Sequence, residues 1–311
     1  MKKLFPILAA LALFSSACQM GGAAEPTPIS LPTAFPTNTP IALNPTAEAA
    51  GPASAGEERV SAVDGMIQVY IPEGSFRMGG MDPRATGDEQ PDHNVTLHAY
   101  WIDKLEVTVG MYTLCTQAGA CEPPQAFNSA TNQQYFTNPD FKDYPVIYVT
   151  WGMADAYCKW AGRRLPTEAE WERAARGDDF RTFPWGDQRP DNSLANFNSN
   201  VGDVTRVGSF PAGVSPFGVL DMSGNVWEWV SDFYDAEYYS SNIALNPTGP
   251  VARSTYFFRV ARGGSYKDAE VDIRVANRAS VLGPDPNADL DSPEYFGVSD
   301  SSIGFRCASD N

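Results

Sequence analysis

The chain has 311 residues and a mass of 33.8 kDa, with 38 Asp and Glu residues against 22 Lys and Arg, and a net charge of −16. An acidic excess of this size repels phosphate backbones, so we expect no nucleic-acid partner. Aromatic residues make up 12% of the sequence, which favours a packed core over disorder in most of the chain. The length fits a single large domain with a tail.

Residues 1–17 have the pattern of a secretory signal peptide. Lys2 and Lys3 precede an apolar run, residues 4–14, which is too short to cross a bilayer as a helix. Small residues then lead directly to Cys18. This arrangement resembles a bacterial lipoprotein cleavage site, so we expect a lipid on Cys18 that anchors the protein to the membrane of the cell envelope. Plain secretion is the alternative, and both predict an extracytoplasmic protein.

Residues 18–57 form a linker rich in Pro, Thr and Ala. Regular helix or sheet cannot persist through closely spaced prolines, so the linker is expected to be an extended, semi-rigid spacer. It would hold the folded head, residues 58–311, away from the membrane surface. The prolines lie at positions 26, 28, 32, 36, 40, 45 and 52.

The first part of the head predicts β-strands. Residues 66–71 have β character, residues 74–79 follow after a turn, and residues 95–102 form a third candidate strand. Much later, residues 257–260 predict another short strand.

Two helices are predicted in the middle of the head. In residues 150–161, Trp151, Ala154 and Cys158 recur at helical spacing. The second helix, residues 168–176, has Thr167 as N-cap and Glu170 three residues later, which completes a capping box. Beyond Gly177 there is little periodicity, so irregular backbone is expected there.

Five cysteines are present, and four remain when Cys18 is set aside. An even number in an oxidising compartment favours disulfides. Cys115 and Cys121 could close a local loop. Joining Cys158 to Cys307 would close a loop of about 150 residues and stabilise the head by roughly 4–5 kcal/mol in the chain-entropy model. A metal or redox site is the rival interpretation, although Cys-x5-Cys is poor zinc spacing.

A series of motifs in one order resembles the formylglycine-generating enzyme, or sulfatase-modifying factor, family. The resemblance covers essentially the whole head and implies an α+β fold of the C-type-lectin-like kind, with little regular secondary structure. It also implies the pairing of Cys158 with Cys307. The motifs are residues 71–79 (IPEGSFRMG), 106–108 (EVT), 149–151 (VTW), 156–172 (AYCKWAGRRLPTEAEWE), 183–187 (FPWGD), 224–229 (GNVWEW), 262–265 (RGGS) and 304–308 (GFRCA).

The resemblance implies a catalytic centre that this sequence does not reproduce. The family's enzyme oxidises a sulfatase cysteine to formylglycine with O2 and a copper(I) ion held by two thiolates, which are the soft ligands that copper(I) prefers. In the family those cysteines fall between the RGGS and GFRC motifs. Residues 266–306 contain no cysteine here, and the two ligand positions read Glu270 and Val275. We therefore expect no copper.

The resemblance also implies structural calcium, which binds hard oxygen ligands. The alternative is that Asp221 and Asn225 only brace turns through side-chain hydrogen bonds. One implied set consists of Asp221, Gly224, Val226 and Glu228, where Gly224 and Val226 would use their carbonyls. The other consists of Asn196, the Phe197 carbonyl, Asp203 and Thr205, in a loop whose length varies in the family.

Three residues match the neighbourhood of the family's substrate groove. Trp227 could flank a peptide, and Arg274 and Arg278 could pair with a ligand carboxylate. The alternative places Trp227 in a tryptophan core and makes both arginines structural.

These observations favour a surface-anchored, non-catalytic module that binds a peptide, protein or glycan. One alternative is a formylglycine-generating oxidase. Another is a ligand-display protein whose C-terminal loops, residues 266–302, vary. A carbon–sulfur bond-forming oxygenase is excluded because it needs a histidine cluster and an additional domain, and the chain has 2 histidines.

Overall fold

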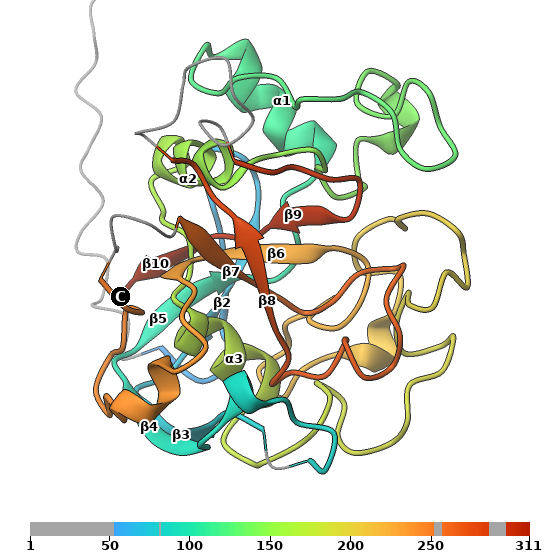
Figure 1. The fold of residues 1–311 in the computed structure, drawn as a ribbon. Coiled ribbons are helices and arrows are strands. Elements are labelled where there is room, and N and C mark those ends of the chain that lie inside the picture. The colour runs from blue at the N-terminus through green and yellow to red at the C-terminus, as the bar shows by residue number, and fades with distance from the viewer. Residues whose placement is uncertain (1–52, 81, 252–256, 286–296) are drawn as a thin grey trace, which may run out of the picture. The chain divides into compact units, whose positions relative to one another are not determined.

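The computed structural model describes residues 53–80, 82–251, 257–285 and 297–311. The predicted signal peptide, Cys18 and most of the linker lie outside these residues and stay predictions. Within the described residues, no helix is both long enough and apolar enough to cross a membrane. The head combines short strands, few helices and long connections, which confirms the predicted α+β class (Figure 1).

The first sheet joins the two ends of the head. Its strands lie in the order β1-β2-β5-β10, and every neighbouring pair is antiparallel. β2 and β5 are the inner strands, and all four residues of β5 are buried. The strands are β1 (Glu58–Val60), β2 (Ile67–Ile71), β5 (Tyr100–Asp103) and β10 (Ala308–Asp310).

The second sheet is a pair of strands, β3 (Gly74–Met78) and β4 (His93–Leu97), with Phe76 opposite Val95. The prediction of one strand over residues 95–102 is wrong, because β4 ends at Leu97 and β5 belongs to the first sheet. His98 breaks the run, since its backbone N–H donates to the Asn246 side chain at 2.8 Å instead of to a strand.

The third sheet crosses the middle of the head in the order β8-β7-β6-β9 (Figure 1). β6 and β9 are parallel, and the other pairs are antiparallel. The predicted strand at residues 257–260 is realised as β7, from Phe258. The strands are β6 (Trp227–Phe233), β7 (Phe258–Arg262), β8 (Arg278–Leu282) and β9 (Ile303–Phe305).

Both predicted helices are present. α2 (Trp151–Trp160) has Thr150 as N-cap, and α3 (Glu168–Arg176) begins with the predicted capping box between Thr167 and Glu170. Every residue of α3 is buried, so this charged helix lies inside the head and its ionised side chains need partners there.

α1 (Val109–Gln117) was missed by the sequence analysis. Val, Gly and Thr are weak helix formers, so local propensity gives little signal. Thr108 caps the helix, and Val109, Tyr112 and Cys115 are buried on one face. Tertiary packing therefore decides this helix. Short 3-10 helices lie at η1 (Gly87–Glu89), η2 (Pro139–Phe141), η3 (Pro211–Gly213) and η4 (Tyr238–Ser241).

Both predicted disulfides are confirmed. Cys115–Cys121 closes a loop with a sequence separation of 6, and Cys158–Cys307 one with a separation of 149. The second bond ties α2 to the residue just before β10, inside a core cluster that includes Tyr157, Trp229 and Phe305. It therefore pins the C-terminal strand to the centre of the molecule.

Loop length predicts how much each disulfide contributes. Removing the long bridge with Cys158→Ala and Cys307→Ala should lower the free energy of unfolding by about 5 kcal/mol, against about 2 kcal/mol for Cys115→Ala with Cys121→Ala. Urea denaturation without reductant measures both. Equal losses in the two variants would contradict an origin in loop closure.

Candidate functional site

All four described cysteines are used in the two disulfides. A thiolate, not a disulfide sulfur, is the ligand that binds metals. None of these cysteines is therefore free to hold copper(I), whichever part of the head it came from.

The two positions predicted to replace the copper ligands lie in different environments. Glu270 is near the surface, where it accepts hydrogen bonds from Arg84 at 2.8 Å and Arg189 at 2.7 Å. Val275 is fully buried in the core with Trp171. The structure does not bring a metal-ligating pair together at these positions.

A buried carboxylate cluster lies where β6 begins. It consists of Glu106, Asp221 and Glu228 around one guanidinium, that of Arg306, which donates to both Glu228 oxygens at 2.6 Å. Burial raises the pKa of Asp221 to about 6. Burial, and then repulsion by Asp221 and Glu228, holds the pKa of Glu106 well above its ordinary value. Three carboxylates thus share one arginine, which leaves an excess of negative charge when all are ionised.

Asn225 connects the carboxylate cluster to the loop that carries Asn196. Its Nδ2 donates to both Glu106 oxygens at 3.0 Å, and its Oδ1 accepts from the Thr205 N–H at 2.8 Å. A Cβ on Gly224 would lie 2.3 Å from the Asn196 carbonyl oxygen, so glycine is required for this close approach. The two predicted calcium sets are therefore neighbours.

Asn196 carries an unpaired oxygen. Its side chain is 1% exposed, its Nδ2 donates to the Asp203 carbonyl at 2.9 Å, and its Oδ1 is buried without a hydrogen-bond partner among the described residues. An unsatisfied buried acceptor costs about 1–3 kcal/mol. The Asp203 carboxylate is also engaged, because its Oδ2 accepts from Ser129 and Thr131 and its Oδ1 accepts from the Val204 N–H at 2.9 Å.

The structure supports the structural alternative for the two arginines predicted to bind ligand. Arg274 donates to the buried Glu89 carboxylate at 2.8 and 2.7 Å, and Arg278 donates to Glu168 at 2.7 and 3.0 Å. Both guanidinium groups already hold carboxylates inside the protein. Trp227 is half-buried in β6 and packs against a core cluster.

Sequence reasoning missed the roles of Glu106, Asn225 and Arg306 as one connected network. Glu106 and Arg306 both fall in recognised motifs, 106–108 and 304–308, which was the available signal. What the sequence does not show is that these motifs meet in space around Asn225.

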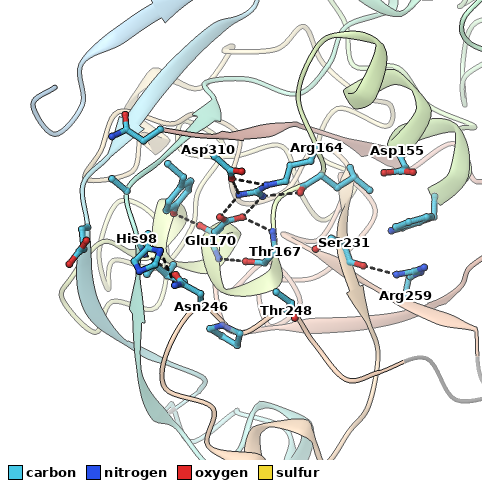
Figure 2. A pocket seen from close by; sticks show the side chains of 18 residues that line it. His98, Asp155, Arg164, Thr167, Glu170, Ser231, Asn246, Thr248, Arg259 and Asp310 are labelled. Carbon is cyan, nitrogen blue, oxygen red and sulfur yellow. Dashed lines mark hydrogen bonds and ion pairs between the residues drawn. The ribbon is translucent and has the colours of Figure 1, made fainter. Parts of the chain in front are cut away.

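A groove of about 810 Å³ lies between α2, β7 and the end of β10 (Figure 2). We call it the Arg259 groove. In Figure 2, Arg259 and Asp155 lie at one end, the ion pairs of Arg164 in the middle, and His98 with Asn246 at the other end. Residues that line it include Trp151, Asp155, Arg164, Glu170, Arg259 and Asp310.

Residues 53–311 match the family model described as "Sulfatase-modifying factor enzyme 1-like domain". The chain belongs to this family. The formylglycine-generating enzyme of Mus musculus is 32% identical over 78% of this chain and 75% of the mouse protein. The fold agrees with the structure of PvdO from Pseudomonas aeruginosa, with a TM-score of 0.65, 25% identity, and coverage of 84% of this chain and 100% of PvdO.

Another relative in this family comparison is a much longer protein. Serine/threonine-protein kinase Pkn1 of Chlamydia trachomatis is 34% identical over 78% of this chain but only 38% of its own length. The chain therefore spans less than two fifths of that relative. Together with the match to PvdO, these findings confirm the family and the fold class predicted from the motifs.

The two metals implied by this family fit the chain differently. Copper(I) does not fit, because the described head has no free thiolate. Calcium fits better at Asn196, which offers an open hard oxygen. At the other set Glu228 is already engaged by Arg306 and by Trp171 at 2.7 Å, although the excess charge there would favour a cation. No group of three His, Cys, Asp or Glu side chains in the described residues forms a metal site by itself.

The structural role of Arg274 can be tested by unfolding. Arg274→Ala should lower the free energy of unfolding by about 3–5 kcal/mol, because it leaves the Glu89 carboxylate buried without a counter-charge. Arg189→Ala, which removes an exposed partner of Glu270, should cost no more than about 1 kcal/mol. Urea titration of the free protein compares them. An Arg274→Ala variant as stable as Arg189→Ala would contradict the structural role of Arg274.

Proposed function

We propose that the head is a non-catalytic binding module of the formylglycine-generating-enzyme-like family. The observation that carries this proposal is the closure of every described cysteine in a disulfide, together with Glu270 and Val275 at the copper positions. With no thiolate pair there is no soft site to hold copper(I). What remains is a rigid, cross-linked scaffold with a groove on its surface.

The N-terminal sequence completes the proposal. A lipid on Cys18 and the proline-rich linker would display the head outside the cytoplasm, within reach of peptide, protein or glycan ligands. Display on a membrane-anchored stalk suits a binding role because it restricts the head to the surface where its ligand is encountered.

A formylglycine-generating oxidase is the second candidate, because the mouse enzyme of that name is 32% identical over 75% of its length. Under this proposal the purified chain, supplied with copper(I), O2 and a sulfatase-motif peptide, leaves the mass of the peptide unchanged. The mouse enzyme in the same assay is the positive control. Conversion of the peptide cysteine to formylglycine, together with stoichiometric copper by elemental analysis, would overturn the non-catalytic proposal.

We also propose a structural calcium ion at the loop of Asn196, next to the carboxylate cluster. The unpaired Asn196 Oδ1 is a hard ligand, and a divalent cation beside the cluster would favour the ionised form of carboxyls whose pKa values burial raises. The ion would tie down the irregular backbone between α3 and β6.

Calcium at about 100 times its dissociation constant should stabilise the native head by about 2.7 kcal/mol relative to the chelated protein. Thermal unfolding with calcium and with a chelator measures this shift. Asn196→Ala should abolish the calcium-dependent shift, whereas Asn192→Ala, an exposed asparagine in the same loop, should keep it. An equal shift with both variants would place the ion elsewhere.

A further inference from the structure

Arg259 is half-buried and differs from the buried arginines of the head in its partners. The described arginines whose side chains are fully or almost fully buried each pair with a carboxylate; they are Arg163, Arg173, Arg176, Arg262, Arg274, Arg278 and Arg306. Arg259 has no such ion pair among the described residues, although the chain has 38 acidic residues against 22 basic ones. Its position at the end of the Arg259 groove leaves it available to a ligand.

The guanidinium of Arg259 is held in a fixed position. Its central carbon lies 3.7 Å from the centre of the Trp151 ring and 3.5 Å from the centre of the Phe233 ring. Nη1 donates to the Ser231 carbonyl at 2.6 Å (Figure 2). An arginine stacked between two aromatic rings and bonded at one nitrogen has lost most of its side-chain freedom, so a ligand would not have to order it.

Part of the hydrogen-bonding capacity of Arg259 is unused. Its Nε is buried and has no hydrogen-bond partner in the described residues, so the protein itself does not satisfy this donor. Burial lowers the pKa of Arg259 to about 10, and the attraction of Asp232 and Asp155 offsets only part of this effect. A planar guanidinium presents its donors in the geometry that matches a carboxylate.

Apart from Arg259, the charged side chains that line the groove are either held in ion pairs or are carboxylates. Arg164 holds both Glu170 and Asp310 at 2.7 Å, so it is not available to an anion. Asp155 pairs with the exposed Lys159, and Glu73 also lines the groove. A purely anionic ligand would meet these carboxylates, whereas a ligand with one carboxylate and otherwise neutral or basic groups would not.

The strand edge at the groove favours a peptide as that ligand. Antiparallel strands alternate inward and outward hydrogen-bonding pairs. The Cys307 carbonyl accepts from the Asp103 N–H, towards β5. On the opposite side, the Ala308 carbonyl accepts from the Arg164 N–H at 2.8 Å, and the Ala308 N–H donates to the Arg164 carbonyl at 2.7 Å. By this alternation the backbone of Asp310 also points away from β5, and no further strand pairs with it in the described residues. An extended peptide can form main-chain hydrogen bonds with the N–H and C=O groups of such a strand edge.

Building on the proposed binding function, we propose that the Arg259 groove binds a peptide carboxylate, with Arg259 as its ionic partner and the rest of the peptide extended along the groove towards β10. The carboxylate comes either from a free C-terminus or from an acidic side chain. This site lies on β7, α2 and β10, apart from Glu270 and Val275.

The experiment uses the full chain and three pools of fluorescein-labelled eight-residue peptides with randomised side chains. One pool lacks Asp and Glu and has a free C-terminus, the second is the same pool amidated, and the third is amidated with one internal Glu. Peptides retained by the immobilised protein are identified by mass spectrometry, and their affinities are measured by fluorescence polarisation. An oligouronate is the carbohydrate probe.

Peptides with a carboxylate should bind at least about tenfold more tightly than their amidated counterparts, which is about 1.4 kcal/mol and is expected for a charge-assisted hydrogen bond. Preference for the first or the third pool identifies the source of the carboxylate. Arg259→Gln should remove the preference. Arg59→Gln should not, because Arg59 is stacked in the same way on Trp101, at 4.2 Å, but does not line the groove.

The acid-against-amide comparison is made on the unaltered protein, so it holds even if Arg259→Gln fails to fold. Equal retention of acid and amide peptides overturns this inference but leaves the non-catalytic proposal intact. Oxidation of a sulfatase peptide removes the non-catalytic proposal instead. If the oligouronate binds and no peptide binds in a carboxylate-dependent way, the proposal that the groove binds a peptide is overturned.

Discussion

Ion pairs buried around α3 are the constraint on which the rest of the head depends. Glu168 and Glu172 project from this helix to Arg278 and Arg262, which belong to β8 and β7. The strands that carry these arginines are short, and the connections between strands are long. Hydrogen bonds within the sheets alone therefore do not determine the positions of many segments. A buried charge without its partner is strongly destabilising, so each pair specifies where a segment distant in sequence must lie.

The same principle explains why the carboxylate cluster is unusual. At α3 the buried acids and arginines are matched, whereas Glu106, Asp221 and Glu228 share Arg306. Asn225 moderates this imbalance by donating to Glu106, but an amide carries no charge. The cluster lies beside the unpaired oxygen of Asn196 and has fewer positive partners than the ion pairs at α3.

Local signals were enough to predict some of the fold. The capping box of α3 lies within four residues, so the sequence shows both of its partners, and the motifs identified the family. α1 and the division between β4 and β5 depend on packing and on a hydrogen bond from His98 to Asn246, 148 positions away. The arginines were ambiguous for the same reason: a sequence shows that Arg274 is charged but not that Glu89, 185 positions earlier, is its partner. The sequence did not indicate a role for Arg259, because the lack of a carboxylate partner can be seen only in the folded structure.

The order of strands also controls when this protein can fold. β9 and β10 come from the last residues of the chain, yet they pair with β6 and β5, and Cys307 between them bonds to α2. Until residues 303–310 have left the ribosome, β6 and β5 lack these partner strands and the Cys158–Cys307 bond cannot form. Contacts between residues so distant in sequence slow folding, because the chain loses loop-closure entropy before these contacts can stabilise it. A chain whose core depends on β9 and β10 therefore stays incompletely folded while the preceding residues are being synthesised.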